Sequence, residues 1–400
     1  MTSTDDPRAA GGTAMYRRTL LALFCAGFAT FSQIYSPQGL LPEIAADFGV
    51  DAGTSSWALG ASTIGVAVGV IPWARLSDRI GRVAAMRWAL LSAMVVGLSA
   101  PLMPGLEAFI AARFLEGLLL SGLPAIAVTA VAETVRLNVL GTTIGIYVAG
   151  NTIGGLSGRI IAAEVGELWG WRAGLIAVAA IAAIGILVFV VIVPPTVVHT
   201  PPAASVWRGL LANLKSPGVM VLVIQPFLLM GGFVAIYNYL AFRLQQPPFD
   251  LTLAQVSWLF LAYLAGALVS SWIWKIIGNT PPVTVMLVCV AVMLAGLGLT
   301  MLPSLWAVIA GLLLFTGSFF GTHSIASALI NRRADVGRSL ATPLYNLGYY
   351  AGSSLLGWLG GIAFAGGGWA GTVAMTAGAA VLAAVLLWAH ARWSRDVERS

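Results

Sequence analysis

Long runs of apolar residues alternate with short polar breaks along the whole chain. Each run is about 20–26 residues long, which suits a tilted α-helix that crosses a hydrocarbon layer of about 30 Å. The pattern therefore predicts twelve membrane-spanning helices. They are expected at residues 18–41, 55–75, 84–103, 107–130, 140–162, 172–193, 217–242, 254–275, 282–302, 304–329, 339–363 and 369–391.

The longest break between runs divides the chain into two sets of six helices. This break contains four prolines and is interpreted as a linker. The first residues are small and polar and predict a disordered tail, and the long run that follows them is not a signal peptide. The predicted organisation is a tail (1–15), an N-terminal six-helix bundle (16–193), a linker (194–216), a C-terminal six-helix bundle (217–391) and a second tail (392–400).

The composition excludes several classes of protein. The 400 residues are 59% hydrophobic and 9% charged, whereas about 25% of the residues of a soluble domain are charged. An ordinary soluble enzyme is therefore excluded, and hydrophobicity this high also excludes a disordered chain. The fold class that remains is an all-α membrane protein.

Lys and Arg residues set the expected orientation in the membrane. With the N-terminus inside, 17 of the 21 Lys and Arg residues lie in or beside cytoplasmic segments, whereas the outer loops collect carboxylates. Loops rich in positive charge stay on the cytoplasmic side. We therefore expect a multi-pass protein of the plasma (inner) membrane, with the linker and both termini in the cytoplasm.

The two halves resemble each other at an offset of about 200 residues. This offset argues for duplicated, pseudo-symmetric six-helix bundles, an arrangement that places a substrate site at the interface of the repeats near the bilayer midplane. The matching residues are Trp57 and Trp258, Gly65 and Gly266, Gly117 and Gly317, Tyr147 and Tyr345, Gly150 and Gly348, and Gly154 and Gly352.

The loop after the second span resembles the signature loop of the major facilitator superfamily, Gly-x-Leu-x-Asp-Arg-x-Gly-Arg. Five of its six defined positions match, namely Leu76, Asp78, Arg79, Gly81 and Arg82, while Ala74 replaces the first Gly. The resemblance implies the twelve-helix fold of these transporters, in which this loop latches one conformational state. The alternative is a solvated charged loop that only fixes topology.

The fifth span contains a stripe of small residues. Gly150, Gly154 and Gly158 recur every four residues, a spacing that lets another helix approach closely. The run of Gly150, Asn151, Gly154 and Gly155 resembles the Gly-Pro-x-x-Gly-Gly signature of drug/proton antiporters, with Asn151 in place of the Pro. Generic helix packing is the alternative interpretation.

The fourth span carries two charged residues, Arg113 and Glu116, that lie three residues apart and can pair on one helical face. Charged groups within a span are costly and usually mark a functional site. Glu116 is the carboxylate well inside a predicted span, so it is the candidate protonatable group. The spacing from Arg113 to Gly117 resembles the Arg motif that the superfamily's antiporters use for proton coupling. A purely structural ion pair is the alternative.

Uncharged polar and aromatic residues are candidates for lining a substrate cavity, although they can also serve as contacts between helices. An aromatic, weakly polar cavity would favour amphiphilic or neutral organic solutes. The candidates are Tyr35, Gln38, Tyr147, Tyr237, Asn238, Tyr345, Asn346 and Tyr349. His323 in the tenth span is either a structural group or a further proton-handling group.

These features predict a secondary transporter that exports a small organic compound in exchange for protons by alternating access. The outer loop that begins at Gln246, with Tyr237 and Tyr263, resembles a sugar- or drug-efflux-like branch of bacterial inner-membrane proteins. No phosphate-binding loop, metal-ligand set or catalytic cluster is present. We therefore expect no enzyme, cofactor, metal or nucleic-acid partner, and the resemblance implies a monomer. The alternatives are a proton-coupled nutrient importer and a membrane sensor.

Overall fold

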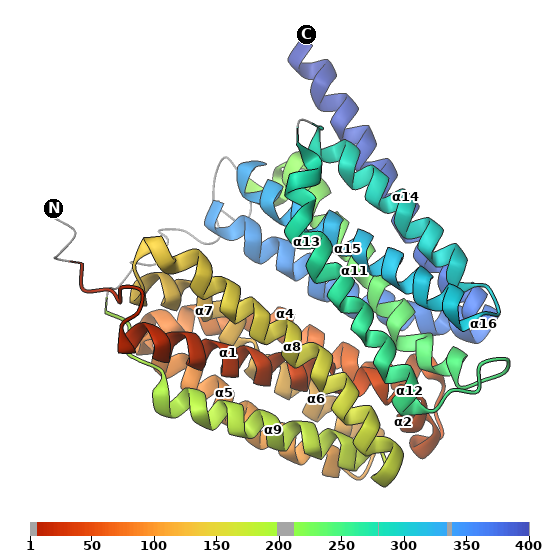
Figure 1. The fold of residues 1–400 in the computed structure, drawn as a ribbon, viewed down its shortest axis with the longest axis horizontal. Coiled ribbons are helices and arrows are strands. Elements are labelled where there is room, and N and C mark those ends of the chain that lie inside the picture. Colours follow the sequence, from red (N-terminus) through yellow and green to blue (C-terminus); the bar gives the residue numbers. More distant parts are fainter. Residues whose placement is uncertain (1–5, 198–211, 279, 334–337, 400) are drawn as a thin grey trace. The chain divides into compact units, whose positions relative to one another are not determined.

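The computed structural model describes residues 6–197, 212–278, 280–333 and 338–399, so most of the predicted linker (194–216) lies outside the described residues. The described chain is helical (Figure 1), and its one β-bridge joins Ala9 to Val135. Its elements are α1 (Ala14–Tyr35), η1 (Ser36–Gly39), α2 (Leu41–Phe48), α3 (Ala52–Ser55), α4 (Trp57–Ile80), α5 (Arg82–Ser99), η2 (Ala100–Leu102), α6 (Leu106–Leu120), α7 (Gly122–Thr134), α8 (Leu137–Trp169), α9 (Trp171–Ile192), α11 (Pro217–Leu244), α12 (Leu253–Ser257), η3 (Trp258–Ala262), α13 (Tyr263–Ile277), α14 (Pro282–Thr300), α15 (Leu305–Arg333) and α16 (Arg338–Arg399).

Helices long and apolar enough to cross a bilayer account for the predicted spans. Eleven such segments occur among the described residues. The last of them lies in α16, where Gly367 and Gly368 leave helical backbone angles and divide the element into two spans. Glycine suits this break because Gly368 has a φ of 57°, which side chains disfavour. The all-α membrane fold is therefore confirmed, and α16 contains both 339–363 and 369–391.

The chain forms two compact units whose boundaries differ from the predicted bundles in one segment. The first unit contains residues 1–43 and 61–202, and the second contains 44–60 and 203–400. Residues 44–60 group with the second unit because α3 packs on α16. At this contact the Ser354 hydroxyl donates to the Gly60 carbonyl oxygen at 3.0 Å. Sequence spacing carried no sign of this contact, because its two sides lie 294 residues apart.

In the first unit, α1 lies against α8 and α9 (Figure 1). The predicted glycine stripe is the surface of α8 that faces α1. A Cβ atom on Gly150, Gly154 or Gly158 would lie only 2.3–2.6 Å from a backbone oxygen of α1. Those oxygens belong to Phe24, Phe28 and Ser32, which recur every four residues as the glycines do. The stripe therefore permits direct backbone contact between the two helices.

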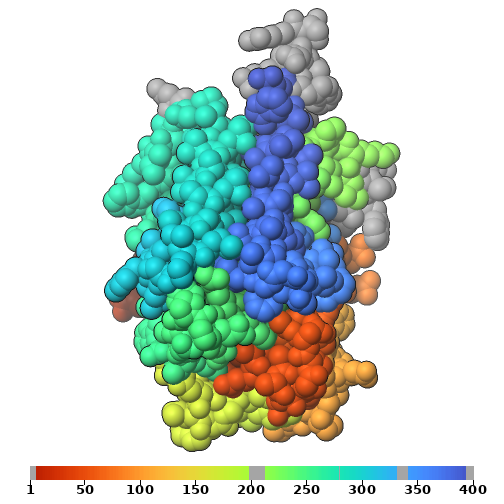
Figure 2. Space-filling model, turned by 90° about the vertical axis from the view of Figure 1, so that its right-hand side faces the viewer, coloured from red at the N-terminus to blue at the C-terminus, as the bar shows by residue number. Residues whose placement is uncertain are grey.

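The second unit repeats this contact between α11 and α16. A Cβ atom on Gly348 would lie 2.6 Å from the Val223 oxygen, and one on Gly352 would lie 2.1 Å from the Phe227 oxygen. These glycines match Gly150 and Gly154 of the first half, so the predicted repeat has the same close helix contact in each unit. Figure 2 shows the second span of α16, in blue, beside α14, which also packs on α16.

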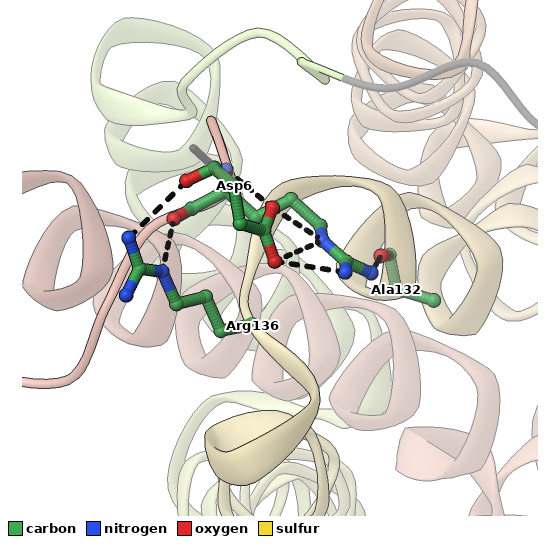
Figure 3. Close-up of polar contacts among 4 residues, drawn as sticks. Asp6, Ala132 and Arg136 are labelled. Atoms are coloured by element: carbon green, nitrogen blue, oxygen red, sulfur yellow. Dashed lines mark hydrogen bonds and ion pairs between the residues drawn. The ribbon is translucent and has the colours of Figure 1, made fainter. Parts of the chain in front are cut away.

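The N-terminal tail differs from the predicted disorder over its described part, residues 6–13. The Ala9 amide donates to the Thr134 carbonyl oxygen at 2.8 Å, and the Arg136 amide donates to the Ala9 oxygen at 3.0 Å. The Arg8 and Arg136 side chains add hydrogen bonds to backbone oxygens on the opposite segment (Figure 3). Backbone hydrogen bonds to the end of α7 and the residues after it thus hold the tail in place, although the tail has few apolar side chains to bury.

Acid should loosen the docking of this tail. Hydrogen bonds from the Arg8 side chain and amide hold the pKa of Asp6 below its ordinary range. The Asp6 carboxylate pairs with Arg8 of the same tail, and Arg8 in turn donates to the Ala132 oxygen of the opposite segment at 3.4 Å. The ionised carboxylate thus supports docking through Arg8 above the ordinary aspartate pKa, and this contribution is lost as the pH falls through the lowered value. A spin label at Pro7→Cys, in a chain whose Cys25 and Cys289 are replaced by Ala, should be less mobile near neutral pH than in acid. With Asp6→Asn the mobility of the label should no longer depend on pH, and a wild-type label equally immobile in acid would contradict the prediction.

Candidate functional site

Arg113 and Glu116 form a buried ion pair in the first unit, as their spacing predicts. Both residues lie in α6, and only 3% of Arg113 and 1% of Glu116 is exposed. A guanidinium nitrogen of Arg113 pairs with Oε2 of Glu116. Two opposite charges at this depth within a membrane-spanning helix satisfy each other, which makes the pair tolerable there.

Arg113 also caps the end of α1. Its second terminal nitrogen donates to the carbonyl oxygens of Gln33 and Ile34, each at 3.0 Å. Pro37 follows this helix, and since proline has no N–H the Gln33 oxygen has no backbone donor from it and accepts instead from Arg113 and from the Ser36 hydroxyl, the latter at 3.0 Å. A cation at a helix C-terminus is favourable because unpaired carbonyls gather there. The position of Arg113 is therefore fixed by α1 as well as by Glu116.

A small cavity adjoins this ion pair. Its water-accessible volume is about 10 Å³, and its lining comes from α1, α5, α6 and α9 with the two short helices η1 and η2. The polar contributors are Gln33, Ser36, Arg113 and Glu116. The ion pair thus contacts a polar space inside the unit rather than apolar side chains alone.

Arg159 is a second buried arginine, near the end of the predicted fifth span (140–162). It is 2% exposed, and its Nε donates to the Gln38 side-chain oxygen at 2.6 Å. A terminal nitrogen donates to the Gly155 oxygen at 2.5 Å, and the guanidinium lies 4.4 Å from the centroid of the Tyr35 ring. The structure therefore joins the predicted residues Tyr35, Gln38 and Gly155 around a charge that the sequence analysis missed.

The signature loop between α4 and α5 is held by a network within the first unit. Asp78 pairs with Arg82, and Arg82 also donates to the Ser77 hydroxyl at 2.7 Å. Arg82 further contacts Glu133, a 1% exposed carboxylate at the end of α7, at 3.5 Å. Gly81 adopts a φ of 93° that connects the two helices. The remaining predicted residues, Leu76 and Arg79, are exposed.

Two predicted residues of α8, Tyr147 and Asn151, face α1 at Gly27. A Cβ on Gly27 would lie 2.3 Å from Oδ1 of Asn151 and 3.0 Å from the Tyr147 carbonyl oxygen. Both residues therefore continue the close contact made by the glycine stripe. α8 continues through Asn151 without interruption, from Leu137 to Trp169.

In the second unit, aromatic side chains form one continuous cluster. The neighbouring ring centroids lie 4.3–6.5 Å apart. The cluster contains Phe233, Tyr237, Phe260, Tyr263, Phe315, Phe319, Phe320, His323, Tyr345, Tyr349 and Tyr350. It unites four of the predicted residues: Tyr237, His323, Tyr345 and Tyr349.

Hydrogen bonds connect the polar edges of this aromatic cluster. The Tyr345 hydroxyl lies 2.8 Å from Nδ1 of His323, and the Tyr237 hydroxyl lies 2.7 Å from the Thr316 hydroxyl. Thr316 matches Glu116 at the repeat offset. The second half therefore has a neutral, hydrogen-bonded side chain at the position where the first half has a carboxylate. Of the other predicted residues, Asn238 is buried and Asn346 is exposed.

Several residues of these clusters escaped the sequence analysis. The four-residue spacing of Phe315, Phe319 and His323 was a usable signal, because it places three rings on one face of a helix. Glu133 and Arg159 gave no such signal, since each lies near the end of a span, where a charged side chain can equally reach the membrane surface. Among the described residues, no group of three or more His, Cys, Asp or Glu could hold a metal ion.

Comparisons with known proteins agree with this architecture. The profile of the Major Facilitator Superfamily matches residues 20–248. The MFS-type transporter YybF of Bacillus subtilis (strain 168) is 32% identical over 390 residues, covering 97% of this chain and 96% of its own. The inner membrane transport protein YnfM of Escherichia coli (strain K12) is 37% identical over 370 residues, covering 92% and 88%.

A solved structure shares the fold. The nucleoside transporter NupG has a TM-score of 0.76 at 16% identity, covering 93% of this chain and 99% of its own. The family profile spans more than half of this chain, and the two relatives span nearly all of it. The chain is thus a member of the Major Facilitator Superfamily and a membrane transport protein.

Proposed function

We propose that this transporter exports a small organic or amphiphilic compound in exchange for protons, by alternating access. The observation that carries the proposal is the ion pair of Arg113 and Glu116, buried within a membrane-spanning helix beside a polar cavity. Arg113 is held by α1 and can stabilise a carboxylate that gains and loses a proton. The corresponding residue of the second half, Thr316, does not titrate, so the first half carries the coupling.

Three further features support this proposal. The aromatic cluster of the second unit suits organic solutes, because rings offer stacking surfaces with a few polar edges. The network of Asp78, Arg82 and Glu133 suits a latch, since conformational change can break and reform its contacts. The relative YnfM is an inner membrane transport protein, and this likeness favours the inner membrane. The distribution of cations favours cytoplasmic termini.

Glu116→Gln should abolish proton-driven transport. A ligand is first identified by thermal shift, because compounds that bind the folded protein raise its stability. In proteoliposomes with a pH gradient, the wild type should accumulate this ligand against its own gradient. Glu116→Gln replaces the carboxyl group with an amide that does not titrate, so accumulation should fall to the level of protein-free liposomes. Exchange of labelled for unlabelled ligand should persist, because it needs no net proton movement.

Glu107→Gln is the matched control, since it makes the same chemical change at an exposed position in the first turn of α6. It should accumulate the ligand as the wild type does. A Glu116→Gln variant that accumulates normally would show that Glu116 is structural, and would refute the proposed coupling. An importer would accumulate the ligand under the opposite pH gradient.

A further inference from the structure

Gln33 is a buried polar side chain that the ion pair does not use. It lies in the last turn of α1 and is 2% exposed. Neither Nε2 nor Oε1 of its amide has a hydrogen-bond partner within the described part of the chain. A buried amide left unpaired costs about 1–3 kcal/mol, and native proteins pair nearly all such groups with protein or water. The side chain therefore requires a partner other than the described residues around it.

The cavity beside the ion pair has the size and lining for that partner. Its volume of about 10 Å³ is close to the minimum of about 10–15 Å³ that one water molecule needs. Gln33, Ser36, Arg113 and Glu116 all line it, so a water there meets several polar groups. Buried waters make two to four hydrogen bonds, whereas apolar cavities of similar size stay dry.

Two acceptor atoms converge on one point of this cavity wall. A Cβ atom on Gly97 would lie 2.1 Å from Oε1 of Gln33 and 2.8 Å from Oε1 of Glu116. An amide oxygen and a carboxylate oxygen cannot donate to each other. A water molecule can donate one hydrogen to each, and glycine at position 97 lets the Gln33 oxygen lie this close to the backbone of α5.

Oε1 is the carboxylate oxygen of Glu116 that remains for a water molecule, because the neighbouring side chains do not bind it. Arg113 pairs with Oε2 and is the charged group that lines the cavity with Glu116. From α9 the lining residues are Leu175 and Ala179, and from α5 and η2 they are Gly97, Ala100 and Pro101, none of which titrates.

We propose that this cavity binds one ordered water, which bridges Oε1 of Gln33 to Oε1 of Glu116. Gln33 and Gly97 are then positioning residues for the carboxyl group. The consequence for coupling rests on the proposed function: a proton that arrives as hydronium at this position passes to Oε1 of Glu116 and leaves the water behind.

Infrared difference spectra of the purified protein between neutral and acid pH test the site without a transport substrate. In the wild type, we expect an O–H stretching band that shifts in oxygen-18 water and is lost in Gly97→Ala, because the added methyl group would collide with Oε1 of Gln33 and displace it from the water. The Glu116 carboxyl band, assigned by its loss in Glu116→Gln, should shift in Gly97→Ala and in Gln33→Leu, since its frequency depends on hydrogen bonding.

Gln225→Leu is the control, because it removes a buried glutamine from α11 in the other unit, where the amide donates to the Ala383 oxygen at 2.9 Å. Both bands should stay unchanged in this variant. A wild type without the isotope-sensitive band, or a carboxyl band that keeps its position in both cavity variants, would overturn the inference. If the infrared bands behave as expected but Glu116→Gln still couples transport to a proton gradient, the water site stands and only the proposed function is refuted.

Discussion

Arg113→Leu should destabilise the protein by about 3–5 kcal/mol, the cost of leaving one member of a buried ion pair without its partner. The change removes the cation that pairs with Glu116, and it also removes the donor to the carbonyl oxygens of Gln33 and Ile34. Unfolding of the detergent-purified protein, followed by tryptophan fluorescence in increasing denaturant, measures the loss.

Two variants separate the causes of that loss. Arg113→Leu combined with Glu116→Leu should recover part of the stability, because no unpaired charge remains, while the hydrogen bonds from Arg113 to the end of α1 are still lost. Arg79→Leu removes an exposed arginine and should change stability by no more than about 0.5 kcal/mol. If Arg113→Leu were as mild as Arg79→Leu, the ion pair could not be holding α1 and α6 together.

Gly154→Val should be the most damaging of the glycine substitutions on α8. Its Cβ atom would lie 2.3 Å from the oxygen and 2.6 Å from the Cα of Phe28. These are backbone atoms, so the only relief is to separate α8 from α1. Overpacking of a well-packed contact costs about 1–3 kcal/mol and sometimes more. Gly352→Val should act alike in the second unit, where the Phe227 oxygen lies 2.1 Å away.

Glycines of the same helices with open surroundings provide matched controls. A Cβ on Gly145 of α8 or Gly378 of α16 meets no atom of the described chain within 4 Å. Alanine there should maintain or raise the melting temperature, since alanine favours helix over glycine by about 1 kcal/mol. Equal effects of Gly145→Ala and Gly154→Ala would contradict the close contact that the structure gives to the stripe.

The sequence was sufficient to predict the features that depend on spacing within one helix. Hydropathy gave the twelve spans, and the three-residue spacing of Arg113 and Glu116 gave the ion pair. The four-residue spacing of the glycines likewise predicted a helix contact. Each of these follows from helix geometry alone.

Contacts between distant parts of the chain were beyond sequence reasoning. Arg113 caps α1 at residues about 80 positions earlier, and α3 packs on α16. The burial of Arg159 depends on its bond to Gln38, 121 residues away. The tail pairs its backbone with the Thr134 segment, and backbone pairing carries no side-chain signature.

The central claim is that Glu116 exchanges a proton as the substrate crosses the membrane. The most direct test uses proteoliposomes loaded with the ligand from the thermal-shift screen, with equal pH on both sides and a pH-sensitive dye trapped inside. As ligand leaves down its gradient, the wild type should acidify the interior, and Glu116→Gln should give no pH change. A wild type without a pH change, or equal acidification by Glu116→Gln, would contradict the account.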